Sequence, residues 1–265
     1  MTNKVLIGLG ALSLILGAVV LANSKLTASL SPATTKTVVT YPLALQETTP
    51  PTSNKEKKIY RLNIPAEQVV IIAGEINGDT VSAASAIDRA SSNNAPVFVL
   101  ISSPGGSILD GATIINAIEA SPVPVYTVCM DICASMAAII HQYGTERLMA
   151  DRAVLMFHDA AGQFEGYFPH IKARFDAFER YVARFNLFIS NRAGVSLLEF
   201  EAMEHKNLWI DSEDAVSKKM AEKIVHIQIF NDNKTVDIKS LLKKGRGAFN
   251  KVNSPVTPNI RELKW

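Results

Sequence analysis

Short apolar segments alternate with Ala-rich or amphipathic segments through the middle of the chain, and this alternation most constrains the fold. The expected strands are 69–76, 96–102, 122–128 and 153–158, and the expected helices between and after them are 80–91, 109–120 and 136–143. Uninterrupted apolar runs of this length are typical of strands that are buried on both faces of a parallel sheet. The succession of strand and helix therefore predicts an α/β fold with right-handed crossovers.

Beyond residue 158 the pattern becomes mostly helical. Residues 168–192 carry aromatic side chains at helical spacing, which predicts one long amphipathic helix. We interpret this aromatic stripe as core or subunit contact rather than as a ligand site. A short helix at 197–205, a short strand at 208–210 and a helix at 212–220 capped by Asp211 complete the predicted domain.

The N-terminus carries a separate signal. After Lys4, residues 5–22 contain no charge, and Ser13 is the only polar side chain. A positive start, an apolar run and small residues near Ala22 are typical of a secretory signal peptide. The run is also just long enough to span a bilayer, so an uncleaved membrane anchor stays open as the alternative. Both interpretations predict a periplasmic or secreted protein, in the second case anchored to the inner membrane by residues 5–22.

Composition divides the chain into four parts. Residues 1–22 are the signal peptide or anchor, 23–57 a flexible linker rich in Thr, Pro, Ser and Lys, 58–230 the folded domain, and 231–265 a basic tail that we expect to be loosely ordered. The chain is 48% hydrophobic and 20% charged, with a net charge of +2. This near-neutral balance argues against a nucleic-acid partner.

Cys129 and Cys133 are the only cysteines. Export would permit a disulfide, but two residues four apart on an extended strand lie about 13 Å from each other. Because disulfide Cα atoms are normally less than about 7 Å apart, we interpret the pair as small buried packing residues. A local disulfide is the less favoured alternative.

Three polar features follow predicted strands. They are the turn Ser-Ser-Pro-Gly-Gly-Ser at 102–107, Ser135 at the start of a predicted helix, and His158. The carboxyl ends of parallel strands share one edge of a sheet, where ligands bind. A serine at a helix N-terminus could attack a carbonyl carbon while backbone N–H groups stabilise the oxyanion, although a plain N-cap is the commoner role. The histidines show no metal-binding spacing, so we expect no metal.

Four segments carry a family resemblance. The segments I-S-S-P-G-G-S, V-C-M-D-I-C-A-S-M-A-A, A-V-L-M-F-H and W-I-D-S-E-D-A occur in this order. Over residues 59–229 the chain resembles the Clp protease proteolytic subunit family. The resemblance implies the ClpP/crotonase fold, a spiral of ββα units with a parallel sheet and a long protruding helix. It also implies a serine endopeptidase that needs no cofactor, assembles into homo-oligomeric rings and cleaves peptides or unfolded proteins.

The resemblance also assigns roles to residues. Ser135 matches the nucleophile and His158 the general base, and the backbone amides of Gly106 and Met136 match the oxyanion hole. The glycine-rich turn matches the segment that binds an extended substrate, with these members: Pro104, Gly105, Gly106 and Ser107.

Asn207 stands where the family has the aspartate of its catalytic triad. We expect Asn207 to be the third catalytic residue, because an asparagine can orient the imidazole of His158 through its side-chain carbonyl, although it supplies no negative charge. Glu204, Asp159 and Asp211 lie nearby in the sequence and could substitute for the missing aspartate. Asp131 and Lys219 also replace family glycines, which indicates local remodelling at both places. We therefore expect a serine peptidase, with a catalytically weakened or inactive peptide-binding scaffold as the alternative.

The predicted location separates this chain from its cytosolic relatives. No ATP is supplied outside the cytoplasm and the sequence has no phosphate-binding loop of the ATPase type, so we expect no ATP-driven unfoldase as partner. Acyl-CoA chemistry on the crotonase fold is a further alternative, but no motif supports it. A Ser–Lys dyad is another, and a His158→Ala variant that stays active would favour it.

Overall fold

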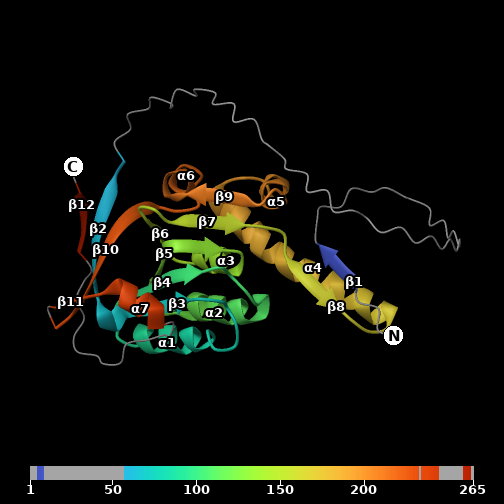
Figure 1. Cartoon of the computed structure of the whole chain (residues 1–265), viewed down its shortest axis with the longest axis horizontal. Coiled ribbons are helices and arrows are strands. Elements are labelled where there is room, and N and C mark those ends of the chain that lie inside the picture. The colour runs from blue at the N-terminus through green and yellow to red at the C-terminus, as the bar shows by residue number, and fades with distance from the viewer. Residues whose placement is uncertain (1–4, 9–56, 233, 245–258, 264–265) are drawn as a thin grey trace, which may run out of the picture. The chain divides into compact units, whose positions relative to one another are not determined.

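The computed structural model describes residues 5–8, 57–232, 234–244 and 259–263 (Figure 1). Most of the predicted signal or anchor, and nearly all of the predicted linker, lie outside the described residues. Within the apolar run, β1 (Val5–Gly8) pairs antiparallel with β8 (Ala161–Phe164). No helix in the described part of the chain combines the length and the apolar character needed to cross a bilayer.

A curled, mostly parallel sheet forms the centre of the domain. Its main path runs β12-β2-β10-β6-β5-β4-β3, with β7 beside β5 and β9 beside β7. The strands are β2 (Ile59–Pro65), β3 (Val69–Ala73), β4 (Val97–Ser103), β5 (Val125–Ala134), β6 (Arg147–Ala150), β7 (Val154–Phe157), β9 (Leu208–Asp211), β10 (Lys223–Asn231), β11 (Lys234–Val236) and β12 (Asn259–Leu263). Only β9, β11 and β12 join their neighbours antiparallel in this sheet. The predicted α/β class with a parallel sheet is confirmed.

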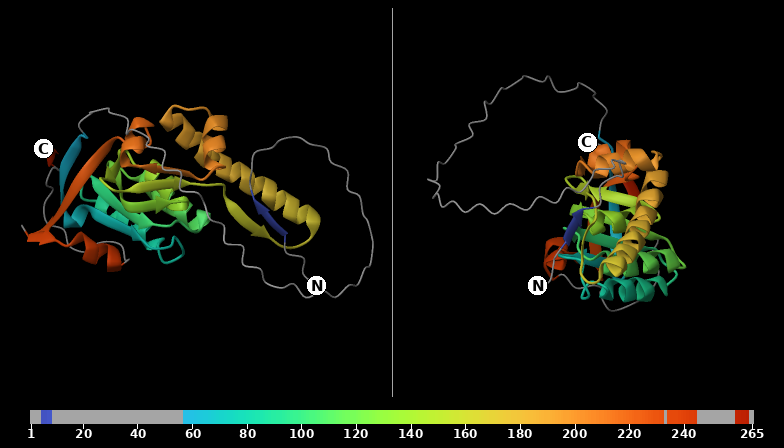
Figure 2. Two further views of the ribbon diagram at one scale, coloured as in Figure 1. Left: turned by 45° about the horizontal axis from the view of Figure 1, so that its top comes forward. Right: turned by 90° about the vertical axis from the view of Figure 1, so that its right-hand side faces the viewer.

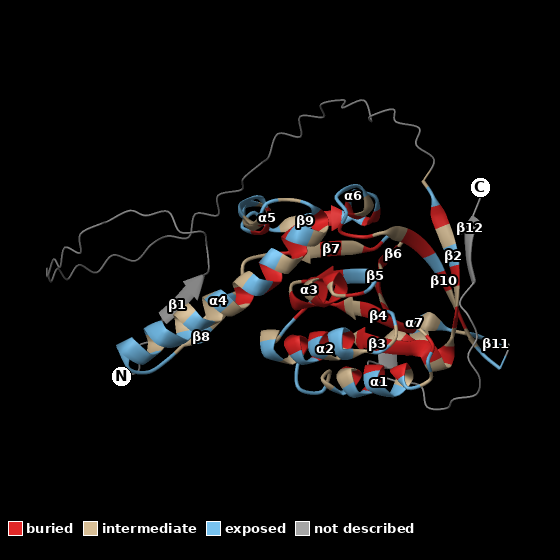
Figure 3. Ribbon diagram, turned by 180° about the vertical axis from the view of Figure 1, so that it is seen from behind, coloured by how far each residue is buried: buried red, intermediate tan, exposed pale blue. Residues whose placement is uncertain are grey.

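Both faces of the sheet are buried. Along β4, Val97, Val99 and Ile101 belong to one hydrophobic cluster, while Phe98 and Leu100 belong to a second. Successive strand residues point to opposite faces, so the two clusters cover opposite sides of the sheet. The uninterrupted apolar run of β4 therefore reflects burial on both sides, as its sequence predicts (Figure 3).

The helices follow the strands in the predicted order. They are α1 (Ser82–Ser91), α2 (Ile108–Ala120), α3 (Met136–Gln142), α4 (Phe168–Ala193), α5 (Leu197–Glu204), α6 (Ser212–Ser217) and α7 (Ile238–Lys244), with a single 3-10 turn, η1 (Ala66–Gln68), after β2. Helices α1, α2 and α3 lie together on one side of the sheet (Figure 1). The helix α3 is almost wholly buried between β5 and the C-terminal half of α4.

The long helix α4 divides into two halves with different surroundings. Its C-terminal half is in the core, where Phe185 and Ile189 are buried and Phe188 stacks on Tyr143 with ring centroids 4.0 Å apart. Its N-terminal half runs past the end of the sheet beside β8 and is largely exposed (Figures 2 and 3). The aromatic stripe therefore contributes to the core only along part of its length.

Cys129 and Cys133 form a disulfide, so the interpretation as unlinked packing residues is wrong. Strand β5 contains a bulge that shortens the path between them. Ile101 pairs with Cys129 and Ser103 with Cys133, so two steps along β4 are matched by four along β5. The cysteine Cα atoms are consequently 5.9 Å apart instead of the separation of an extended strand. At the same bulge β5 changes its other neighbour from β6 to β7.

The region after residue 220 is more ordered than its polar sequence suggests. Strand β10, whose alternating apolar residues we did not identify, pairs with both β2 and β6. The segment predicted as a loosely ordered basic tail contains β11 and α7, with Leu241 buried in the second hydrophobic cluster. Residues 245–258 lie outside the described part.

Candidate active site

Ser135 occupies the junction between β5 and α3 with an unusual backbone conformation. Its φ is 55° and its ψ is −127°, in a region that residues with a side chain rarely adopt. Such a conformation costs on the order of 1–3 kcal/mol and is found mainly where function requires it. Two hydrogen bonds hold it, from the Ser135 amide to Met156 O at 2.8 Å and from the Ile139 amide to Ser135 O at 3.1 Å.

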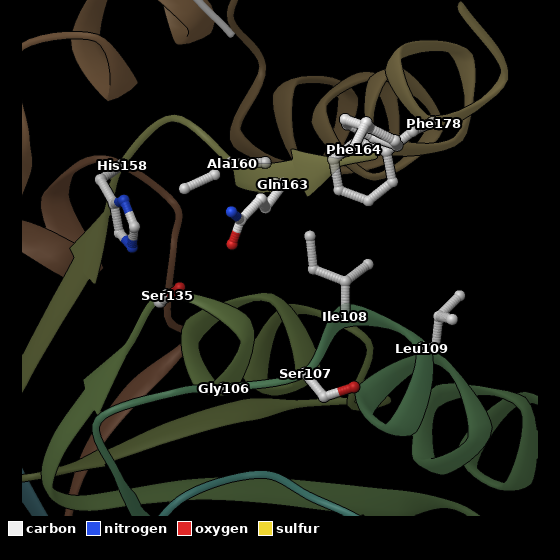
Figure 4. A pocket seen from close by; sticks show the side chains of 12 residues that line it. Gly106, Ser107, Ile108, Leu109, Ser135, His158, Ala160, Gln163, Phe164 and Phe178 are labelled. Atoms are coloured by element: carbon white, nitrogen blue, oxygen red, sulfur yellow. The ribbon is translucent and has the colours of Figure 1, made fainter. Parts of the chain in front are cut away.

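The hydroxyl of Ser135 makes no capping hydrogen bond to α3. This separates it from Ser107 and Ser196, whose side chains accept a backbone N–H at the starts of α2 and α5. The plain N-cap role that the sequence left open for Ser135 is therefore not what the structure contains. The hydroxyl is instead directed to a surface cavity (Figure 4).

The glycine turn after β4 packs directly against this junction. Gly105 has φ 98°, and a Cβ atom there would lie 2.6 Å from both Ala134 O and Ser135 Cβ. Gly106 has φ 146°, and a Cβ atom there would overlap the backbone of Ile76. The turn therefore requires glycine at both positions, for its backbone angles and for its close approach to neighbouring chain.

Backbone hydrogen bonds with Ile76 hold one side of this turn, and they do not involve the amide of Gly106. The Ile76 amide donates to Gly105 O and the Ser107 amide donates to Ile76 O, both at 2.8 Å. The Gly105 amide donates to Ser103 Oγ at 3.1 Å. In the described structure the amide of Gly106 has no hydrogen-bond partner. The amide of Met136, the first residue of α3, belongs to the helix turn whose N–H groups have no partner within the helix.

His158 follows β7 and faces the same cavity as Ser135 (Figure 4). The cavity has a volume of about 420 Å³, which lies in the range of small-ligand pockets. Its lining residues come from the glycine turn and α2, the β5–α3 junction, the β7–β8 segment and α4: Gly106, Ser107, Ile108, Leu109, Ser135, His158, Ala160, Ala161, Gly162, Gln163, Phe164 and Phe178. The structure thus brings together three features that are separate in the sequence.

No hydrogen bond joins Ser135 to His158, and neither ring nitrogen of His158 has a partner among the described residues. Side-chain hydrogen bonds at catalytic sites are often long or absent before substrate binds. The arrangement can perform nucleophilic attack once the imidazole and the hydroxyl turn toward each other. The unpartnered amides of Gly106 and Met136 could then stabilise the developing oxyanion.

Asn207 does not line this cavity. It is exposed, with φ 56°, in the turn that follows α5, and its amide donates to Glu204 O at 2.8 Å. Asp159 pairs with the exposed His205 at 2.6 Å, and the side chain of Asp211 caps α6 as predicted. Of the four candidates for the third triad member, Glu204 lines a small cavity together with Ser135 and His158.

The outer wall of the large cavity could not be predicted from the sequence. Gln163 and Phe164 belong to β8, a short strand that was not predicted, and Phe178 comes from the exposed half of α4. The only available signal was the helical spacing of the aromatic residues in α4, because β8 contains no sustained apolar pattern. With Ile108 and Leu109 opposite, these aromatic rings make one end of the cavity apolar (Figure 4).

Comparisons with known proteins agree with this geometry. The family model "Clp protease" matches residues 52–228. Over 182 residues the chain is 24% identical to "ATP-dependent Clp protease proteolytic subunit 1" of Prochlorococcus marinus subsp. pastoris, covering 66% of this chain and 90% of that protein. Clp protease family members are serine peptidases that typically form oligomers and act on peptides. The chain belongs to the Clp protease family, and its curled parallel sheet is the fold of that family.

Proposed function

We propose that this protein is a serine endopeptidase that cleaves peptides or unfolded proteins outside the cytoplasm. The observation that carries the proposal is the shared cavity of Ser135, His158 and Gly106, with Ser135 in a strained backbone conformation. A strained serine between a strand and a helix is the usual arrangement of a nucleophile whose hydroxyl must be exposed. Membership of a peptidase family supports the same chemistry.

The reaction proceeds through an acyl-enzyme. Ser135 Oγ attacks the carbonyl carbon of the scissile bond while His158 takes the hydroxyl proton. The amides of Gly106 and Met136 bind the oxyanion of the tetrahedral intermediate. The C–N bond then breaks as His158 gives its proton to the leaving amine. A water molecule, deprotonated by His158, releases the acyl group from Ser135 by the same steps.

Two observations support action outside the cytoplasm. Residues 5–22 have the sequence of a signal peptide or anchor. The Cys129–Cys133 disulfide is of a kind that persists in oxidising compartments and is rare in the cytosol. In such a compartment the enzyme works without an ATP-driven unfoldase, on substrates that are already unfolded. As in other family members, we expect a homo-oligomer.

Labelling with a fluorophosphonate tests the chemistry on the full chain. We expect the wild type to be labelled at Ser135, and Ser135→Ala to lose both labelling and hydrolysis of fluorogenic peptides. Ser92→Ala is the matched control, because Ser92 is exposed at the end of α1 and its hydroxyl donates to Arg89 O of the same helix. Both variants are compared with the wild type by circular dichroism to show that they fold.

The alternative is a peptide-binding scaffold without peptidase activity. The exposed position of Asn207 favours it, since no residue of the family's triad then faces the far side of His158. Wild-type protein that is folded, binds unfolded peptides and resists labelling, beside a reactive control enzyme, would establish the scaffold and overturn the peptidase.

Cell fractionation tests the location. A full-length tagged chain should appear in the exported or membrane fraction of bacterial cells, with Cys129 and Cys133 protected from thiol alkylation until a reductant is added. A Leu12→Arg/Leu14→Arg variant interrupts the apolar run, so it should accumulate in the cytoplasm. Cytoplasmic wild-type protein with alkylatable cysteines would contradict the proposal.

A further inference from the structure

The family's triad position is filled here by an exposed asparagine, but a buried carboxyl group lies one helical turn before it. Glu204 is the last residue of α5, three positions before Asn207, and is only 5% exposed. A fully buried glutamate is rare unless it is paired. Its location therefore requires either a structural partner or a function.

Glu204 lines a second, small cavity together with both candidate catalytic side chains. This cavity has a volume of about 20 Å³, and Ser135, His158 and Glu204 contribute all of its charged or hydroxyl-bearing side chains. The remaining walls are apolar and come from α2, α3, α4, β7 and the segment after it: Ile108, Met136, Ile139, Phe157, Ala160, Val182 and Phe185. A cavity of this size holds one water molecule when polar groups face it.

The recorded hydrogen bonds satisfy Glu204 only in part. Asn186 Nδ2 donates to Glu204 Oε2 at 2.7 Å, and this is the only side-chain hydrogen bond that the structure gives the carboxyl group. Asn186 is itself 5% exposed, and its Oδ1 has no partner. A carboxylate can accept several hydrogen bonds, so Glu204 keeps capacity for a second donor. Among the residues that the structure describes, neither ring nitrogen of His158 has a hydrogen-bond partner.

We propose that Glu204, rather than Asn207, orients His158, through a single water molecule in the small cavity. The inference rests on the proposed peptidase function. Glu204 Oε1 accepts a hydrogen bond from the water, whose oxygen accepts a hydrogen bond from the N–H of the imidazole. Asn186 holds the carboxylate in place from α4. Glu204 is therefore a positioning residue, and its negative charge stabilises the imidazolium that forms when His158 takes the serine proton.

The surroundings of Glu204 make the ionisation of its carboxyl group sensitive to the charge of His158. Burial raises the pKa of Glu204 to about 7, while the hydrogen bond from Asn186 acts in the opposite direction. The charges of Asp159 and Glu201 add to the increase, and Asp159 is itself paired with His205. A positive imidazole beside Glu204 favours its ionised form, so the two groups stabilise each other's charge in the transition state.

Replacement of Glu204 by glutamine tests the proposal, because glutamine keeps the shape and removes the charge. We expect Glu204→Gln to lower kcat/KM by about 100-fold or more, mainly through kcat, with little change in KM. Glu204→Asp keeps a carboxylate and should recover part of the loss. Glu199→Gln, on the exposed first turn of the same helix, is the matched control and should stay within about twofold of the wild type.

Two further readouts separate orientation of His158 from a merely structural role. In Glu204→Gln the acidic limb of the pH profile of kcat/KM should move to lower pH, because the imidazolium loses its neighbouring negative charge. The NMR titration midpoint of the His158 ring, recorded on the Ser135→Ala background, should move in the same direction. This measurement needs no activity, so it tests Glu204 even if the peptidase proposal fails.

The outcomes are distinct. Wild-type activity in Glu204→Gln with a large loss in Asn207→Ala would overturn the proposal in favour of Asn207. An unchanged His158 titration in Glu204→Gln would overturn it regardless of activity. If Glu204→Gln does not fold, the same titration and kinetics are measured on Glu204→Asp, where an unchanged midpoint and unchanged kcat would also count against it.

Discussion

Each end of helix α3 has a histidine and another polar side chain, but the two ends differ in burial and in hydrogen bonding. At its N-terminal end, Ser135 and His158 face cavities and make no side-chain hydrogen bonds within the described structure. At its C-terminal end, His141 and Gln142 are completely buried. The helix α3, seven residues long, therefore has a histidine-containing site that is open at one end and one that is closed at the other.

At the closed end, the polar side chains form one connected series of hydrogen bonds. His141 Nε2 donates to Leu148 O at 3.0 Å, and His141 Nδ1 accepts from Gln142 Nε2 at 3.1 Å. Gln142 Oε1 accepts from Arg147 Nη1 at 2.8 Å, and Arg147 forms an ion pair with Glu222. Burial lowers the pKa of His141 to about 4, so the ring is neutral at physiological pH.

The difference between the ends distinguishes structural from functional polar residues in this protein. Buried polar groups normally find partners, because each unmade hydrogen bond costs free energy. The C-terminal end of α3 follows that rule, and its residues connect α3 to β6, α4 and the chain after α6. Near the N-terminal end the buried pair Glu204 and Asn186 satisfies it only in part, and the half-buried Ser135 and His158 make no side-chain hydrogen bond within the described structure.

The largest expected effect comes from removing one histidine at each end. His158→Ala should lower kcat/KM about 10³-fold, because it removes the general base, and should leave stability nearly unchanged. His141→Leu should lower the free energy of unfolding by about 2–3 kcal/mol, because it removes the donor to Leu148 O and leaves one N–H of the Gln142 side-chain amide without its acceptor. Peptide kinetics and urea unfolding of both variants measure this. A His158→Ala variant that stays active would point to a lysine base instead.

The next effect is the pH dependence of stability, which has opposite signs at the two ends. His141 is neutral in the folded protein, so the unfolded chain binds the extra proton and stability falls as pH decreases from 6.5 to about 4. The raised pKa of Glu204 means that the folded protein holds a proton longer, so its contribution falls as pH rises from 4.5 to about 7. Each contribution is on the order of 3 kcal/mol.

Urea unfolding between pH 4 and 8 measures both contributions. The free energy of unfolding of the wild type, minus that of His141→Leu, should grow as pH rises from about 4 to 6.5. The free energy of unfolding of the wild type, minus that of Glu204→Gln, should fall as pH rises from 4.5 to about 7. The glutamine variant therefore becomes relatively more stable at neutral pH. Parallel curves for either pair would contradict the assignment for that end of the helix.

A smaller effect is expected from the disulfide, which lies just before the open end. Cys129→Ala/Cys133→Ala should lower the free energy of unfolding by about 2 kcal/mol, from the entropy of a five-residue loop. Because the bulge in β5 leads directly into Ser135, kcat/KM should fall about tenfold, while amide exchange near His141 should not change. Reduction of the wild type should reproduce the effect, and reductant should not alter the variant. Full activity of the variant would show that the disulfide at the bulge does not influence the active site.

The smallest expected effect concerns the turn that supports the closed end. Lys219 has φ 55°, and the turn places Met220 O to accept from Gln142 Nε2 at 3.0 Å. Lys219→Gly should therefore raise the free energy of unfolding by about 1 kcal/mol, since glycine adopts positive φ without strain. Lys218→Gly is the control, because its φ of −88° gives glycine no advantage. Thermal unfolding in which Lys219→Gly is less stable than Lys218→Gly would contradict this prediction.

At Lys219 and Asp131 the sequence predicted remodelling, and the two positions differ. At Lys219 the turn that ends α6 holds a lysine in a conformation that suits glycine. Asp131 lies in the bulge of β5, which the disulfide closes. The bulge could not be predicted from spacing, because it depends on which residues of β4 pair with β5.

The sequence alone determined the α/β class, the order of most strands and helices, and the position of Gly106, Ser135 and His158 at the ends of three of the predicted strands. Those properties follow from local patterns of apolar residues and from the common edge of parallel strands. Only the tertiary structure decided that Glu204 faces the site while Asn207 faces solvent, and that Cys129 meets Cys133. These depend on where helix α5 ends and on how two strands pair, and both are set by packing between distant segments rather than by neighbours in the chain.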